Sequence, residues 1–199
     1  MSSFNLYYKT QLIDKVSLFP NQMTANLDDF ILENLSSKMK GKTTEHGIVL
    51  KINHIIDYGI GIIDKSNFTG SAEFNVKYEC LLCHPENNLE IICTVDNLFM
   101  GFIIGSNGPI TVNILTNMVD INKFEVVGDS VKYLPTGKQL VTSDLIRVTI
   151  INIQSNMGEP TIHVIAKLND MATDAEIKRY KSDLDMVYGN QTLSTSAFI

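Results

Sequence analysis

The sequence predicts an α+β protein with a mixed first half, an all-β second half and a helix near the C-terminus. Three patterns indicate this fold class. Residues 4–83 mix strand-like and helix-like spacing of apolar side chains, about five short strand patterns follow in the second half, and residues 173–188 return to helical spacing. A turn-forming stretch at residues 85–88 separates a first part, residues 1–84, from a second part, residues 85–170. The helix-containing residues 171–199 form the third part.

The first part begins with a strand pattern over residues 4–19, which Pro20 ends. A helix is expected next, with Asn26 as its N-cap, Asp28 and Asp29 in the first turn, and Gly41 just beyond its end. Its apolar stripe consists of Leu27, Phe30, Ile31, Leu35 and Met39.

Two further strands are expected over residues 44–56 and 72–83. In the second, Phe74, Val76, Tyr78 and Cys80 fall on one face. Residues 58–63, between them, read as an apolar tip or a short return strand, and residues 67–70 read as a turn.

The second part is all-β by its pattern. Strands are expected over residues 90–97, 101–105, 110–114, 131–134, 145–154 and 161–168. Short strands of this number suit a small closed barrel such as an OB fold, with residues 116–142 holding its long connection.

The third part contains a capping box of Thr173 and Glu176, and Gly189 closes the helix that follows. An apolar stripe along this helix needs a surface to cover it, either on a partner or on this chain. Its members are Ile177, Tyr180, Leu184, Val187 and Tyr188. Residues 190–199 are expected to form a loose end.

Composition narrows the class of protein. Of 199 residues 44% are hydrophobic, which is typical of a globular chain, and no apolar run approaches a membrane span. The start of the chain does not resemble a secretory signal, and three cysteines favour a reducing compartment. The formal net charge is −6, and residues 86–122 contain no Lys or Arg, so strong electrostatic binding of nucleic acid is not expected.

The cysteine pattern Cys80-Leu-Leu-Cys83-His84 has the spacing of a haem attachment, and Cys93 could complete a metal set. Residues three apart in a strand point to opposite faces, so buried strand cysteines are the favoured interpretation and no metal or cofactor is expected. No phosphate-binding loop or catalytic constellation is recognisable, which argues against a free-standing enzyme.

Two aromatic residues of the barrel could stack bases on an open face. Phe99 is equally compatible with stacking and with the barrel core, whereas the spacing of Phe102 and Ile104 favours the core for Phe102.

Residues 70–78, Gly-Ser-Ala-Glu-Phe-Asn-Val-Lys-Tyr, resemble the signature of the larger stalk subunit of multisubunit RNA polymerases. This family includes the seventh subunit of eukaryotic polymerase II and its archaeal counterpart. The resemblance extends over residues 4–170, through Leu18-Phe19-Pro20, Gly41 and the segments 47–50, 101–102 and 108–112.

The resemblance implies a noncatalytic subunit with two domains, a truncated ribonucleoprotein-like tip domain and an OB barrel that faces emerging RNA. The tip would dock on the polymerase core near the clamp and support initiation, and a smaller stalk subunit is a further candidate partner. The residues assigned to docking are Tyr58, Gly59, Ile60, Gly61, Ile62 and Ile63. The residues assigned to weak RNA contact are Phe99, Lys123, Lys132, Tyr133, Lys138 and Arg147.

The sequence departs from the family in its acidic barrel, its apolar tip and its C-terminal extension. The lysine-rich composition is typical of an AT-rich genome and suggests a homologue from a large DNA virus. Such a homologue would be found in the virion and the cytoplasmic viral factory, whereas a cellular homologue would be nuclear. Two alternatives remain: a stand-alone RNA-binding or translation factor, and an interaction module that has lost RNA binding. An apolar tip distinguishes a docking subunit from a free RNA-binding protein.

Overall fold

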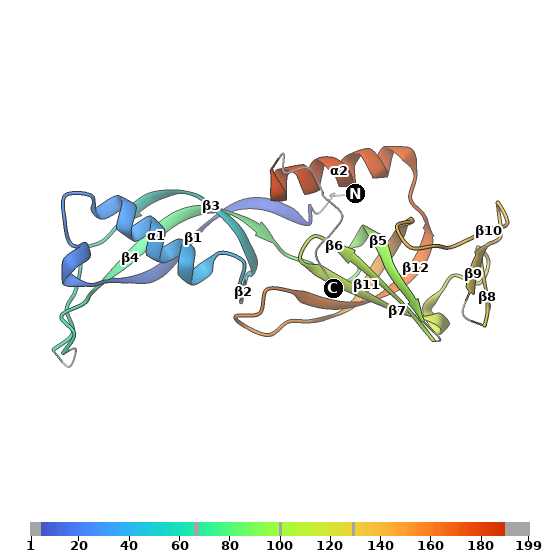
Figure 1. Cartoon of the computed structure of the whole chain (residues 1–199), viewed down its shortest axis with the longest axis horizontal. Coiled ribbons are helices and arrows are strands. Elements are labelled where there is room, and N and C mark those ends of the chain that lie inside the picture. Colours follow the sequence, from blue (N-terminus) through green and yellow to red (C-terminus); the bar gives the residue numbers. More distant parts are fainter. Residues whose placement is uncertain (1–4, 66–67, 100, 129, 190–199) are drawn as a thin grey trace. The chain divides into compact units, whose positions relative to one another are not determined.

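The computed structural model describes residues 5–65, 68–99, 101–128 and 130–189, and its labelled elements are shown in Figure 1. The chain divides into two compact units. The first comprises residues 1–86 and 154–162, and the second comprises residues 87–153 and 163–199. The predicted strand start at Phe4, the predicted turn start at Asn67 and the predicted loose end at residues 190–199 lie outside the described residues.

The first unit is built on a four-stranded antiparallel sheet in the spatial order β1-β4-β3-β2. Its elements are β1 (Tyr7–Leu18), the short 3-10 helix η1 (Pro20–Gln22), α1 (Leu27–Met39), β2 (Thr43–Thr44), β3 (Gly47–Tyr58) and β4 (Ala72–Cys83). The strand predicted over residues 72–83 is confirmed at both ends. Because β4 pairs with β1 on one side and β3 on the other, it is the central strand of this unit.

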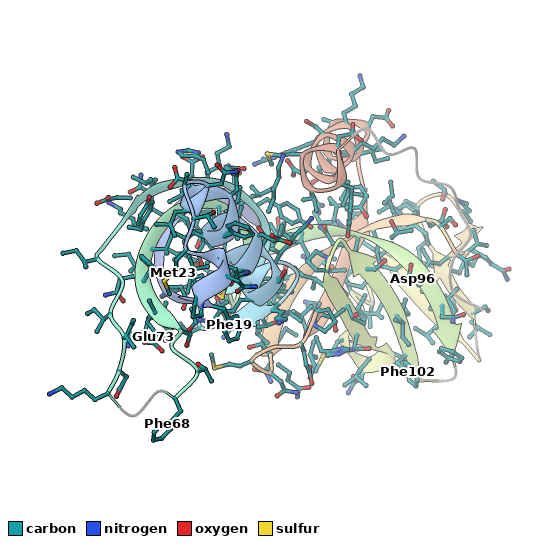
Figure 2. The ribbon with its side chains drawn as sticks, turned by 60° about the vertical axis from the view of Figure 1, so that its left-hand side comes forward. Phe19, Met23, Phe68, Glu73, Asp96 and Phe102 are labelled. Atoms are coloured by element: carbon teal, nitrogen blue, oxygen red, sulfur yellow. The ribbon has the colours of Figure 1, made fainter. Side chains whose placement is uncertain are left out.

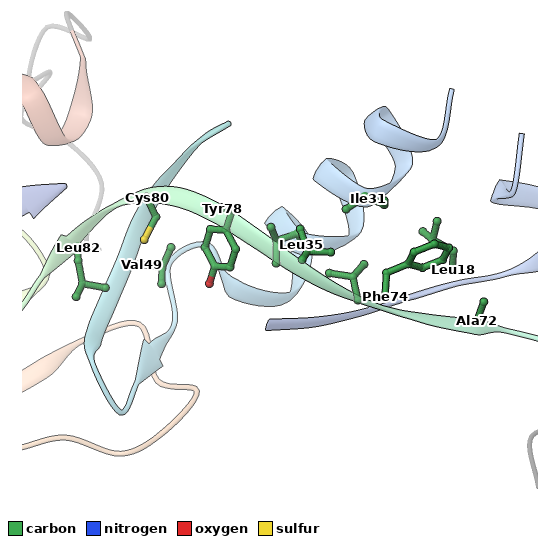
Figure 3. Close-up of a cluster of buried hydrophobic side chains, with 11 residues drawn as sticks. Leu18, Ile31, Leu35, Val49, Ala72, Phe74, Tyr78, Cys80 and Leu82 are labelled. Carbon is green, nitrogen blue, oxygen red and sulfur yellow. The ribbon is translucent and has the colours of Figure 1, made fainter. Parts of the chain in front are cut away.

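The core of the first unit lies between β4 and α1 (Figure 3). Phe74, Val76 and Tyr78 alternate along β4 and are buried, as predicted, and α1 contributes the fully buried Ile31 and Leu35. Burial of a side chain of this size contributes about 1.5–3 kcal/mol, so these contacts hold the helix on the sheet. The alternation within residues 70–78 is therefore required by packing.

Helix α1 begins and ends where the sequence predicts. Asn26 is its N-cap residue, although its side chain makes no capping hydrogen bond, and Asp28 and Asp29 lie in the first turn. Gly41 follows the helix with φ of 72°, a left-handed conformation that glycine adopts without steric cost. The short strand β2 begins two residues later.

Residues 154–162 join the first unit through hydrogen bonds beside β2. Thr43 donates to the backbone oxygen of Glu159 from its N–H at 2.8 Å and from its hydroxyl at 2.7 Å. The Gly158 N–H in turn donates to the Thr43 carbonyl at 2.9 Å. These bonds satisfy backbone groups at an edge that would otherwise be open.

The second unit contains a closed five-stranded barrel in the order β11-β12-β7-β6-β5. Its strands are β5 (Glu90–Phe99), β6 (Phe102–Asn107), β7 (Ile110–Leu115), β11 (Leu145–Gln154) and β12 (Ile162–Met171). The predicted small barrel is confirmed, and its topology is compatible with an OB fold. Gly105 is needed for close strand approach, because a Cβ at this position would lie 2.7 Å from the Thr94 carbonyl oxygen.

The long connection between β7 and β11 contains a second, smaller sheet. It begins with the 3-10 helix η2 (Thr116–Met118) and continues with the strands β8 (Phe124–Val127), β9 (Ser130–Tyr133) and β10 (Lys138–Gln139) in the order β10-β9-β8. The sequence pattern predicted only the strand over residues 131–134. The strands β8 and β10 were missed because they are short and mostly exposed, so they show little hydrophobic alternation.

The C-terminal helix α2 (Asp174–Tyr188) packs against the barrel of its own unit. Its predicted capping box is confirmed: the Thr173 N–H donates to the Glu176 carboxylate at 2.8 Å, and the Glu176 N–H donates to the Thr173 hydroxyl oxygen at 3.5 Å. The Tyr180 and Thr94 hydroxyls lie 3.1 Å apart, which ties the middle of the helix to β5. The apolar stripe of α2 was expected to pack either on a partner or on this chain, and the barrel of this chain provides such a surface.

The three cysteines are free and buried, as the favoured interpretation predicted. Burial raises the pKa of Cys80 to about 11 and that of Cys83 to about 12, so both remain thiols at neutral pH. Within the described ranges no group of three His, Cys, Asp or Glu side chains could hold a metal ion. Among the described residues, no helix is long and apolar enough to cross a membrane.

Candidate functional site

The predicted docking segment, residues 58–63, begins against the core of the first unit, where Tyr58 is partly buried. The Tyr58 ring meets the Phe74 ring edge-on, with centroids 6.2 Å apart. Its hydroxyl donates to Asp28 Oδ1 at 2.6 Å, and this hydrogen bond raises the pKa of Tyr58. Tyr58 is therefore an anchor that fixes the start of the segment to the start of α1.

The next residues run beside the first residues of β4. The Gly59 N–H donates to the Asn75 carbonyl at 3.0 Å, and Ile62 and Glu73 exchange two backbone hydrogen bonds of 2.9 Å. Gly61 lies against the Phe74 ring, where a Cβ would come within 2.5 Å of a ring carbon. Gly61 thus lets the segment lie flat on β4, and the backbone hydrogen bonds of Gly59 and Ile62 hold it in place.

The apolar side chains of this segment face away from the core. Ile60 is 89% exposed, and Ile62 and Ile63 are also exposed. Three more exposed apolar residues belong to the same end of the unit: one directly before η1, one directly after it and one on the β3–β4 connection (Figure 2). We call the six residues the tip surface: Phe19, Met23, Ile60, Ile62, Ile63 and Phe68.

Half of the tip surface was predicted from the sequence. Phe68, which is fully exposed, was missed because a single aromatic residue in a polar turn carries no periodic signal. Phe19 and Met23 were missed because they were assigned to a strand end and a loop. Pro20 lies 3.5 Å from the position of a Gly70 Cβ, which brings η1 next to the β3–β4 connection.

On the barrel, Phe99 and Phe102 face solvent together. Their ring centroids lie 5.3 Å apart and their planes are tilted by 37°. The assignment of Phe102 to the core was wrong. In β6 the inward positions are Ile103, Gly105 and Asn107, so Phe102 and Ile104 point outward.

The cations predicted to contact RNA are mostly paired with carboxylates. Lys123 Nζ and Arg147 Nη2 both contact Asp170, and the Tyr133 hydroxyl donates to the same carboxylate at 2.8 Å. Burial alone would raise the pKa of Asp170, but the hydrogen bonds from Lys123 and Tyr133 outweigh it and hold the pKa below its usual value. Arg147 Nη1 also lies 3.1 Å from Glu176 of α2.

The other two predicted cations lie near β10. Lys138 Nζ is 2.7 Å from Asp144, while Lys132 is exposed in β9 opposite Glu125 of β8. The structure therefore brings Lys123, Tyr133 and Arg147 together around one carboxylate, and it leaves Phe99 apart from them on β5. A phosphate would have to compete with a carboxylate to bind Lys123, Arg147 or Lys138.

Comparison with known proteins adds three relatives. The chain is 47% identical, over the full length of both chains, to a protein of Acanthamoeba polyphaga mimivirus that is named as a DNA-directed RNA polymerase subunit. It is 27% identical over 131 residues to DNA-directed RNA polymerase II subunit RPB7 of Glycine max, covering 64% of this chain and 72% of the relative. It is 23% identical over 168 residues to DNA-directed RNA polymerase II subunit 7 of Arabidopsis thaliana, covering 83% and 93%. No family model matches the chain.

Proposed function

The chain belongs to the family of DNA-directed RNA polymerase subunits that includes subunit 7 of polymerase II, and we propose that it serves as the noncatalytic larger stalk subunit of a viral enzyme. Its place of action would then be the virion and the cytoplasmic viral factory, as expected of a homologue from a large DNA virus, and the mimivirus relative supports the viral origin. The observation that carries the docking role is the tip surface.

The tip surface has the properties of a docking site. It gathers exposed aliphatic and aromatic side chains at one end of the first unit, a composition that marks protein contact sites. The backbone beneath is held by the Ile62–Glu73 hydrogen bonds and by the packing of Tyr58 on Phe74. Because this part is already ordered, little conformational entropy would be lost when the side chains enter a pocket on the polymerase core.

The barrel would contribute a weaker contact to the emerging transcript. Lys132 is exposed, whereas Lys123, Lys138 and Arg147 are engaged by carboxylates. Few phosphates can be neutralised by such a surface, so binding would be weak and would depend little on salt. The alternative of a stand-alone RNA-binding or translation factor gains no support from the relatives, which are named as polymerase subunits.

The docking role is tested by the double variant Ile60→Asp with Ile62→Asp in a tagged full chain. We expect the polymerase core to be lost from the purified complex, because two buried carboxylates in an apolar pocket would go unpaired. Ile13→Asp is the matched control: Ile13 is an exposed isoleucine of the same unit in the middle of β1, outside the tip surface. An unchanged thermal melt shows that the double variant is folded, and co-purification at the wild-type level would refute the role.

A further inference from the structure

A β-bulge decides which face of the barrel carries Phe99. In β5, Ile91, Cys93 and Val95 are buried at alternate positions, and continued alternation would place Phe99 inside. The pairing of β5 with β6 shifts between Val95 and Asn97, so one extra residue enters β5 there. This shift turns Phe99 to the outer wall and also leaves Asp96 exposed.

The outer wall then carries an exposed apolar row across three strands. Phe99 pairs with Phe102, and Phe102 pairs with Leu115 of β7. The three side chains are 46%, 39% and 43% exposed. We call Phe99, Phe102 and Leu115 the barrel row; Figure 2 shows Phe102 and Asp96 on this wall.

A hairpin-stabilising role explains only part of this row. A cross-strand aromatic pair is worth about 0.5–1.5 kcal/mol beyond its burial, which accounts for Phe99 and Phe102 facing one another. It does not account for Leu115, which extends the exposed apolar surface onto a third strand. An exposed apolar surface that continues over three strands is large enough to pack against an apolar group of a partner.

The charges around the barrel row decide between a protein and a nucleic acid. Residues 86–122, which include all of β5, β6 and β7, contain no Lys or Arg, whereas Asp96 lies on the outer wall and accepts a hydrogen bond from the Ser106 hydroxyl at 3.1 Å. Surfaces that stack single-stranded nucleic acid combine aromatic side chains with a basic groove. On its own three strands the barrel row has the aromatic part without a cation, and the adjoining strand β12 carries one exposed lysine, Lys167.

We propose that the barrel row binds a protein segment in which an apolar anchor is flanked by Lys or Arg, and that it does not stack the bases of RNA. The apolar anchor would pack on Phe99, Phe102 and Leu115, and the flanking cations would be attracted by Asp96. The barrel row shares no residue with the tip surface, so this proposal can be tested independently of the docking role.

The test uses the full chain and four labelled probes: the peptide Lys-Arg-Leu-Phe-Leu-Arg-Lys, a twin with Asp in place of Lys and Arg, a twin with Ser in place of Leu and Phe, and an oligouridylate. We expect only the first peptide to bind well. The double variant Phe99→Ser with Phe102→Ser should weaken that binding about tenfold or more, because anchor residues dominate such contacts. Oligouridylate binding should not change.

Two controls keep the result decisive. Ile121→Ser removes an exposed isoleucine of the same unit outside the barrel row and should leave peptide binding unchanged. If the double phenylalanine variant does not fold, Leu115→Ser alone should still weaken binding of the first peptide. Loss of oligouridylate binding on either change, equal binding of the Ser twin, or no binding of the first peptide would each overturn the proposal.

Discussion

Arg147 of β11 and Glu176 of α2 form an ion pair, with Nη1 3.1 Å from Oε1, and this contact joins the first turn of the C-terminal helix to the barrel. The same Glu176 carboxylate completes the capping box with Thr173. One side chain therefore both starts the helix and attaches it. Two substitutions at this position can separate the two roles.

We expect Glu176→Gln to keep the cap and weaken the attachment, since glutamine can replace glutamate in a capping box but carries no charge. Glu176→Ala should lose both and cost about 1 kcal/mol more in local helix stability. Hydrogen exchange across residues 177–187 measures the difference. Equal exchange in the two variants would show that the cap contributes nothing beyond the ion pair.

The attachment of α2 should weaken in acid. Burial alone would raise the pKa of Glu176, but hydrogen bonds from Thr173 and the charge of Arg147 outweigh it, so the folded pKa lies below the ordinary 4.5. The contribution is therefore complete above about 4.5 and is lost as pH falls through the lower folded pKa. Exchange in α2 should be constant from neutral pH to about pH 5 and rise below it, after correction for the intrinsic rate. A rise that begins near neutral pH would contradict this origin.

The tip should depend on Gly61 and tolerate a change at Gly59. A Cβ at Gly61 would press into the Phe74 ring at 2.5 Å, whereas at Gly59 the nearest atom is 3.9 Å away. Gly61→Ala should therefore lift residues 58–63 from β4 and reduce recovery of the polymerase core. Gly59→Ala should recover the core normally. Similar recovery by both variants would mean that the position of the segment on β4 does not matter for docking.

Tyr78→Phe should not destabilise the first unit. The Tyr78 hydroxyl is buried, and in the described part of the chain it has no hydrogen-bond partner. Removing a buried, unsatisfied polar group is neutral or stabilising, by up to about 1 kcal/mol, whereas Tyr78→Ala should cost about 3–5 kcal/mol through loss of packing. Urea unfolding gives both values. A loss above about 1 kcal/mol for the phenylalanine variant would reveal a hydrogen bond to the hydroxyl.

RNA binding should improve when a paired cation is released. Asp144→Asn removes the partner of Lys138, so an oligouridylate should bind more tightly and with a salt dependence steeper by about one ion. Asp185→Asn changes the net charge equally at an exposed position of α2 and serves as the control. Equal gains from both changes would indicate a general charge effect without a role for Lys138.

Those parts of the fold that depend on local periodicity could be predicted from the sequence. The alternation of Phe74, Val76 and Tyr78 indicated the limits and the buried face of β4, and Gly41 marked the end of α1. The capping box of Thr173 and Glu176 marked the start of α2. The segment 70–78 also indicated the family to which the chain belongs. Each of these signals is carried by residues within a few positions of one another.

Which side chains are available to a partner depends on the tertiary structure. A single extra residue in β5 places Phe99 on the outer side of the barrel, where simple alternation would have placed it inside. No local sequence pattern predicts this bulge, because it arises from the pairing of β5 with β6. Phe68 and Phe19 belong to the same end of the first unit only because the sheet places the β3–β4 connection beside η1. Lys123 and Arg147 met Asp170 across strands far apart in sequence, and this pairing removed charges that composition alone counted as free. Exposure and ion pairing depend on contacts distant in the chain, and periodicity does not encode them.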